Sequence, residues 1–121
     1  MPPERFGAIH LLPNGVEIIF HGKRRVFRRK LPDRILTFNW SDVTQVVAFK
    51  RDCFTVDNIR LAFEIDGEVV VEIHEDMAGW TDLLDALPGN LPGALPLEVW
   101  WAKVAFPPFE LCLTKLYTRA G

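Results

Sequence analysis

The segment IRLAFEIDGEVVVEI, residues 59–73, has the pattern of a β-hairpin. Apolar side chains alternate with polar or small ones before Asp66-Gly67, and the alternation resumes after this dipeptide. Such a period of two is typical of strands that bury one face, and an Asp-Gly pair between them is a turn signal. The segment therefore predicts an antiparallel sheet at the centre of the fold.

The register of this hairpin can be predicted from the alternation of side chains between the two faces of the sheet. A two-residue loop would place apolar residues opposite acids, whereas a three-residue loop over 65–67 pairs Phe63 with Val69 and keeps one face apolar. Gly67 then takes the left-handed third position of the loop. The same register places Arg60 opposite Glu72, so the sequence predicts a cross-strand ion pair.

The residues before this hairpin also indicate antiparallel strands. Pro13-Asn14-Gly15 predicts a turn, because proline presets its first position and glycine accepts a left-handed one. A second turn at His21-Gly22 leads into a strand over 23–29. β-Branched and aromatic residues favour further strands over 9–12, 16–20, 35–40 and 43–50.

A helical period follows His74. Apolar residues recur at three- and four-residue spacing from Met77 to Leu87, with Asp76 as the expected N-cap and Pro88-Gly89 as the expected end. Pro96 suits the first turn of a second, short helix that extends to Phe106. Residues 109–117 are apolar enough for either a closing strand or a strap across the core.

Length and composition limit the classes of protein that this chain can belong to. Its 121 residues predict one domain, 1–121, with a core over about 8–87 and a C-terminal helix and strap over 94–117. The 49% apolar and 25% charged residues exclude general disorder, and the net charge of −2 gives no global signature of nucleic-acid binding. No apolar run reaches the ~20 residues of a membrane span. Without a secretory signal at the N-terminus, the expected location is the cytoplasm, with Cys53 and Cys112 as free thiols.

The sequence contains no familiar catalytic motif. It has no Walker loop, dinucleotide fingerprint, nucleophile elbow or zinc-protease motif. The triplet His74-Glu75-Asp76 has residue types that bind metals or transfer protons, but neighbours in a strand point to opposite faces. The end of a strand followed by a helix cap is the simpler interpretation. We therefore expect no enzymatic activity, no cofactor and no metal, with an unrecognised enzyme as an alternative.

The strongest charge pattern is the basic run KRRVFRRK, residues 23–30. Residues 1–34 carry eight basic and three acidic side chains. An exposed edge strand protected from aggregation by its cations explains this run. The alternative is an anion-binding or membrane-surface site, and its candidate residues are Arg24, Arg25, Arg28 and Arg29.

An acidic stretch forms the counterpart of the basic run. Residues 57–85 hold nine acids and a single cation, Arg60. Such a surface repels nucleic acid and suits a cationic protein partner, although a solvated face explains it as well. The candidate partner-binding acids are Glu72, Glu75, Asp76 and Asp82.

Four tryptophans are many for a chain of this length. Trp100 and Trp101 are neighbours on the second predicted helix, about 100° apart around its axis. Because only a widely covered helix can bury both, one of them is a candidate for a contact surface.

The segment FNWSDVTQV, residues 38–46, resembles a step in bacterial pleckstrin-homology-like domains that introduces a strand in the middle of the sheet. Over about residues 8–117 the chain resembles small, functionally uncharacterised bacterial proteins with such a GRAM/PH-like domain. Further residues that carry this resemblance are Ala48 to Asp52, Thr55 to Asp57, Ile59, His74 to Asp76, Gly79, Trp80, Trp100, Val104 and Phe109 to Tyr117. The resemblance implies a partly open barrel, capped by a helix and used for binding. Eukaryotic relatives of the fold often bind phosphoinositides, and residues 23–30 superficially match that use.

We therefore expect an α+β domain with a strongly bent antiparallel sheet or a partly open barrel, one capping helix and a short helical C-terminal tail. The expected function is that of a non-enzymatic bacterial module that binds a cationic protein through its acidic face, of which an immunity or inhibitor protein is the concrete version. The alternative is a module for anionic ligands or membrane surfaces. Homo-oligomers and peripheral membrane contact stay open, and no nucleic-acid partner is expected.

Overall fold

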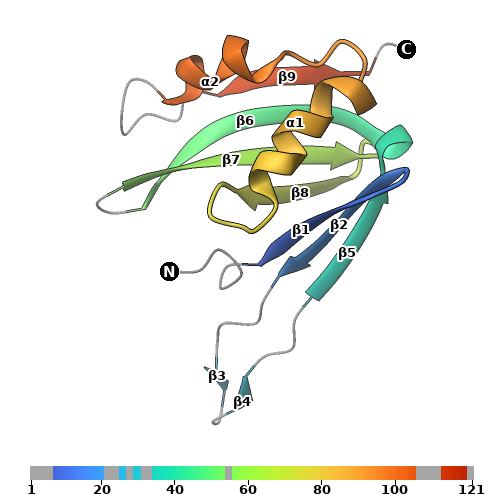
Figure 1. Cartoon of the computed structure of the whole chain (residues 1–121). Helices are drawn as coiled ribbons and strands as arrows, with labels where there is room; N and C mark the ends of the chain where they lie inside the picture. Colours follow the sequence, from blue (N-terminus) through green and yellow to red (C-terminus); the bar gives the residue numbers. More distant parts are fainter. Residues whose placement is uncertain are drawn as a thin grey trace.

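Two open antiparallel sheets, a separate two-stranded pair and two helices form the described part of the chain (Figure 1). This computed structural model describes residues 7–20, 25–26, 29–30, 34–53, 56–105 and 113–119, and for 25–26, 29–30, 51–53 and 56–57 it describes the backbone alone. The first sheet has the order β1-β2-β5 and consists of β1 (Ala8–Leu12), β2 (Gly15–Phe20) and β5 (Arg34–Asn39). The second sheet has the order β8-β7-β6-β9 and consists of β6 (Val43–Cys53), β7 (Val56–Ile65), β8 (Val69–His74) and β9 (Thr114–Thr118).

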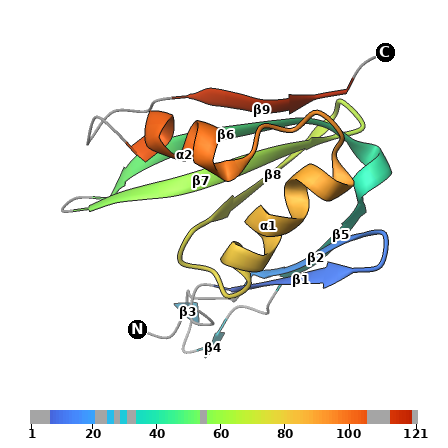
Figure 2. The same cartoon turned by 45° about the horizontal axis from the view of Figure 1, so that its top comes forward.

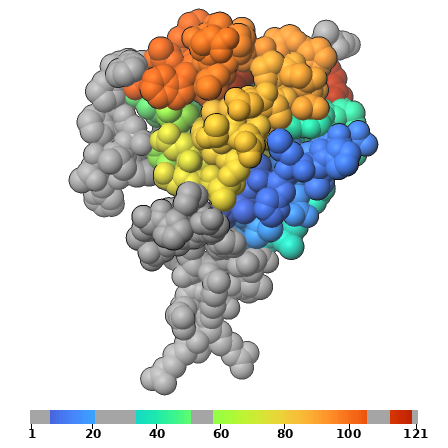
Figure 3. Space-filling model, in the orientation of Figure 1, coloured from blue at the N-terminus to red at the C-terminus, as the bar shows by residue number. Residues whose placement is uncertain are grey.

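The connections between the sheets set the layers of the molecule. A 3-10 turn, η2 (Trp40–Asp42), links β5 to β6. Helix α1 (Trp80–Asn90) contacts β1, and helix α2 (Leu97–Ala105) contacts β6 and β9. Figures 1 and 2 show α1 crossing the space between the two sheets and α2 lying over the edge formed by β6 and β9. In the space-filling view of Figure 3, the helical residues, yellow to orange, cover this side of the second sheet.

The prediction of an α+β domain with antiparallel strands is confirmed. Two separate open sheets take the place of one bent sheet: β5 is an edge strand of the first, β6 lies inside the second, and η2 connects them without any pairing between them. The described chain also does not end in a helical tail. Strand β9 follows α2 and pairs with β6, so residues 114–117 of the predicted strand or strap belong to a strand, which extends to Thr118.

The basic run forms two strands where one was predicted. Strands β3 (Arg25–Val26) and β4 (Arg29–Lys30) pair antiparallel, so the chain reverses between them. Backbone pairing places Arg25 opposite Lys30, which brings basic residues side by side.

The predicted hairpin exists as β7 and β8, but its predicted register is wrong by two residues. The pairs are Ile65 with Val69 and Phe63 with Val71, so the connecting residues are 66–68. Both Asp66 (φ 54°) and Gly67 (φ 71°) adopt positive φ, which places the tight turn one residue later than the loop of the prediction. A shift of two keeps every side chain on its face, and the predicted Arg60–Glu72 ion pair forms diagonally with an N–O distance of 3.0 Å.

Helix α1 begins later and ends later than the sequence predicts. Its N-cap is Gly79, at φ 89°, and not Asp76. The residues before it pair instead with β1, because the Ile9 N–H donates to the Ala78 carbonyl at 2.7 Å. Pro88 lies in the last turn of the helix and has no N–H to donate, yet the helix continues past it, and the Leu91 N–H donates to the Leu87 carbonyl at 2.8 Å.

The core lies between the two sheets and under both helices. Phe38 of β5 and Phe63 of β7 join the sheets, with ring centroids 5.4 Å apart. Trp100 of α2, 1% exposed, is the largest fully buried side chain of the described residues. The apolar face of α1 contributes Leu83, Leu84 and Leu87 to the same core. The two helices of the described ranges thus cover one side of the second sheet, and no described helix lies on its other side.

Candidate functional site

The uncovered side of the second sheet carries an apolar hollow, and we call this side the outer face. Strand alternation produces it, because Leu61, Phe63 and Ile73 turn into the core while their neighbours turn away from it. The hollow has a volume of about 240 Å³. Its lining residues are Gln45, Val47, Phe49, Ala62, Glu64, Val70 and Leu113.

Large apolar side chains remain exposed on and beside this hollow. Val70 and Leu113 are each 63% exposed, whereas Val69, 52% exposed, alternates with Val70 and turns to the same side of the sheet as Val71. The run Val69-Val70-Val71 explains this, since three valines in succession must turn at least one of them away from the core. Single exposed apolar residues are ordinary, but a hollow with exposed valine and leucine at its rim is typical of an interaction surface.

Acidic residues surround one end of the outer face. Glu64 accepts a hydrogen bond of 2.8 Å from the Thr44 hydroxyl, which holds its carboxylate beside the hollow. Asp66 and Glu68 are exposed in the β7–β8 turn next to Val69. Away from the turn, Lys115 of β9 pairs with Val47 across the sheet, so the negative charge gathers at the turn end.

The four predicted partner-binding acids do not form one surface. Glu72 lies on the outer face, where it pairs with Arg60. Glu75 and Asp82 line a different hollow, next to the start of α1. Asp76 is exposed, and its carboxylate accepts a 2.8 Å hydrogen bond from the Asn58 amide.

Glu75 has a structural task that the sequence does not reveal. Its carboxylate accepts a hydrogen bond of 3.0 Å from the Ile59 N–H, and its own N–H donates to the Ile59 carbonyl at 3.0 Å. Burial raises the pKa of Glu75, the Ile59 hydrogen bond opposes that change, and the nearby Asp76 adds to it. This side chain therefore ties the end of β8 to β7.

His74 belongs to the same local network. The Asp76 N–H lies 3.3 Å from His74 Nδ1, and an Asp76 carboxylate oxygen lies 3.9 Å from the same nitrogen. Within the described ranges, no three histidine, cysteine or acidic side chains are placed to hold a metal ion.

The remaining predicted residues lie elsewhere. Trp100 is buried in the core, and Trp101 of α2 is 44% exposed, so Trp101 is the one of the pair that a partner can reach. Arg25 and Arg29 belong to β3 and β4, whereas Arg24, Arg28 and Cys112 lie outside the described residues.

A second and larger hollow lies where the two sheets meet, and sequence reasoning missed it as well. The segments that line it are 13–14, 39–41, 90–92 and 117–119, which are far apart along the chain. No local pattern in the sequence marks such a site. For the outer face a signal existed in the three consecutive valines of β8.

Comparison with known proteins found no family model that matches the chain, and no curated protein or solved structure that is similar to it. Neither helix in the described ranges combines the length and the apolar character needed to cross a bilayer.

Proposed function

We propose that this chain is a non-enzymatic protein-interaction module that binds its partner through the outer face. The observation that carries the proposal is the apolar hollow beside Val70, on the side of the sheet that no described helix covers. Its volume of about 240 Å³ is below the roughly 300–1,000 Å³ of most small-molecule sites. It suits one apolar side chain of a partner, anchored in a pocket at the centre of a larger contact.

The charge at the turn end of the outer face indicates the chemistry of the partner. Glu64, Asp66 and Glu68 favour a protein that presents lysine or arginine beside its apolar anchor. Such complementarity speeds association and gives a strong dependence on salt. An immunity or inhibitor protein that neutralises a cationic protein in a bacterial cytoplasm is the concrete form of this proposal.

The proposal also keeps the pleckstrin-homology-like classification. Two antiparallel sheets packed against a helix support it, and binding through a sheet face is a use that such a scaffold allows.

The test compares two variants that differ in the face they alter. Val70→Asp places a charge in the hollow, and Ile35→Asp places the same charge on β5 of the first sheet. The two positions are matched, because Val70 is 63% and Ile35 66% exposed. A photo-crosslinking residue at each position, introduced in the source cells, would identify what touches each face.

We expect a discrete basic protein to crosslink at position 70 and not at position 35. Its affinity for the purified chain should fall with salt and with V70D, but not with I35D. Equal binding by V70D and the unaltered chain would refute the outer face as the binding surface. A homodimer of the purified chain that V70D dissociates would replace the foreign partner with a second copy.

The basic hairpin supports a second candidate function, the binding of anionic surfaces. Pairing of β3 with β4 brings Arg25 opposite Lys30, next to the other cations of residues 23–30. This candidate predicts sedimentation with vesicles that contain phosphatidylserine, at low salt, and its loss when Arg25 and Arg29 are replaced by Gln. No sedimentation at low salt would remove this candidate.

A further inference from the structure

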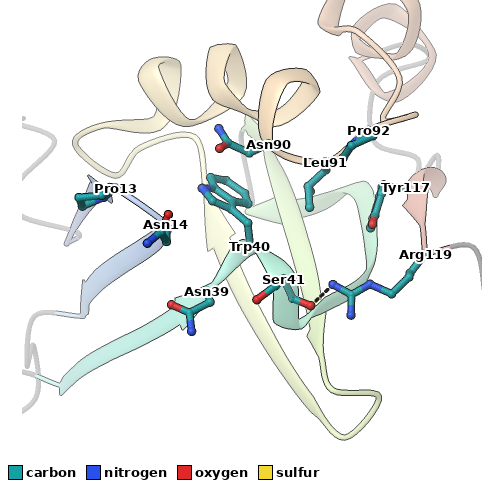
Figure 4. Close-up of a pocket in the computed structure, with 10 residues that line it drawn as sticks. All are labelled: Pro13, Asn14, Asn39, Trp40, Ser41, Asn90, Leu91, Pro92, Tyr117 and Arg119. Carbon is teal, nitrogen blue, oxygen red and sulfur yellow. Dashed lines mark hydrogen bonds between the residues drawn. The ribbon is translucent and has the colours of Figure 1, made fainter.

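The hollow where the two sheets meet is a built pocket, which we call the junction pocket (Figure 4). Its volume of about 570 Å³ falls within the roughly 300–1,000 Å³ of small-molecule sites. Four segments contribute to it: the β1–β2 turn, the end of β5 with η2, the end of α1 with the residues that follow it, and the end of β9 with Arg119. The lining residues are Pro13, Asn14, Asn39, Trp40, Ser41, Asn90, Leu91, Pro92, Tyr117 and Arg119.

The chemistry of the junction pocket differs from that of the rest of the surface. The whole chain has 16 acidic and 14 basic residues, yet among the ten described residues that line the pocket Arg119 alone is a basic or acidic side chain. Three of the other lining residues are asparagines, whose amides can donate and accept hydrogen bonds. Buried Trp40, Leu91 and Tyr117 supply the apolar part of the wall.

Arg119 is held in place across the pocket. One guanidinium nitrogen of Arg119 donates to the Ser41 carbonyl, as Figure 4 shows. The backbone N–H of Arg119 donates to the Thr44 carbonyl at 2.9 Å. A guanidinium group has five N–H donors, so this one contact leaves it able to bind an oxyanion through two parallel hydrogen bonds. Because the guanidinium group is already fixed, binding loses less conformational entropy than it would with a mobile arginine.

The walls of the pocket are fixed as well. The Trp40 N–H donates to the Asn14 carbonyl at 2.9 Å, which holds the β1–β2 turn against η2. At the end of α1, the Asn90 side-chain amide donates to the Ala86 carbonyl at 2.8 Å, which leaves its oxygen as an acceptor. The site is therefore assembled before any ligand arrives.

We propose that the junction pocket binds a small organic anion, whose carboxylate or phosphate group faces Arg119 and whose hydroxyl or amide groups face the asparagines. This site is separate from the outer face, and it gives the chain a ligand in addition to a protein partner. The single cation provides the attraction, and the ring of amides favours a polar ligand over an apolar one. Because none of the described lining residues carries a carboxylate, an anion in the pocket meets no direct repulsion from its wall.

The test measures binding of four probes to the purified chain by titration calorimetry and by the shift in melting temperature. Glucose 6-phosphate and glucuronate carry the two forms of the anionic group, glucose lacks it, and inorganic phosphate lacks the polar body. Each probe is used at up to about 10 mM, which reveals a Kd near 1 mM. We expect at least one of the two sugar anions to bind saturably, and glucose and inorganic phosphate to bind more weakly.

Arg119→Gln should lower the affinity for the anion by about 10- to 100-fold, since it removes a charge-assisted pair of hydrogen bonds. The matched control is Lys115→Gln, which removes a positive charge from β9, four residues before Arg119 and outside the pocket, and should leave the affinity unchanged. Asn39→Asp, at an exposed position of the lining, should lower the affinity for the anion through charge repulsion. This variant tests the proposal if R119Q does not fold. The proposal is overturned if no anion binds saturably, if glucose binds as well as the sugar anions, or if K115Q and R119Q lose affinity equally.

Discussion

Gly79 holds the start of α1 against β1, and its replacement by alanine is the sharpest test of the fold. The residue adopts φ 89°, a region that costs an L-residue roughly 1–2 kcal/mol. A Cβ at this position would also overlap the backbone carbonyl oxygen of Ile9. Backbone cannot rotate away, so β1 must move and the hydrogen bond from the Ile9 N–H to Ala78 must weaken. Loss of that bond adds about 0.5–1.5 kcal/mol, so Gly79→Ala should destabilise the protein by about 1.5–3.5 kcal/mol in total.

The matched control for this variant is Gly93→Ala. Gly93 has the same backbone conformation, φ 90°, but an added Cβ there meets nothing within 4 Å. The control should therefore lose only the roughly 1–2 kcal/mol of the left-handed conformation. Denaturant unfolding gives both values, and the difference between them measures the contact with β1. Equal losses for the two variants would refute the conclusion that β1 is held by the residues before α1.

Two further predictions concern Glu75 and the tryptophans. Because burial raises the pKa of Glu75 above its ordinary 4.5, the native state holds this proton more tightly than the unfolded chain, so stability falls as pH rises from 4.5 through the raised pKa. Glu75→Gln has no titrating group at this position. The difference in melting temperature between this variant and the unaltered chain should therefore shift in favour of the variant as pH rises through the same window. Parallel curves of melting temperature against pH would show that Glu75 is not the group responsible. Trp100→Ala should cost about 3–5 kcal/mol, because the side chain is 1% exposed, whereas Trp101→Ala, at 44% exposure, should cost less than about 1 kcal/mol. Similar losses of unfolding free energy for the two tryptophan variants would contradict the placement of α2.

Sequence patterns predicted the elements of the fold better than their boundaries. The alternation in residues 59–73 is enough to find β7 and β8 and to say which side chains enter the core. It cannot separate two registers that differ by two residues, because both keep the same faces. The choice depends on the turn, where Asp66 takes a positive φ that is uncommon for non-glycine residues, although aspartate adopts it more readily than most.

The site residues were harder to predict, because their partners lie far along the chain. Asp76 has the residue type of an N-cap, yet Asn58 binds its carboxylate across 18 positions of sequence. The predicted acidic surface is divided in the same way, since Glu72 is engaged by Arg60 and Glu75 by Ile59. Charge counted along a sequence thus gives the sign of a region, but not which acids remain available to a partner.

The place of β9 in the second sheet has a consequence for how the chain acquires its fold. Strands β6, β7 and β8 follow one another and can pair through short turns as soon as they leave the ribosome. β6 then presents an unpaired edge until residues 114–118 emerge, about seventy positions after the residues with which they pair. Closing so long a loop is slow compared with forming a hairpin, and an open edge is a template for aggregation in the meantime. Synthesis therefore leaves an interval in which the edge of β6 is open, and the interval ends when β9 pairs with it.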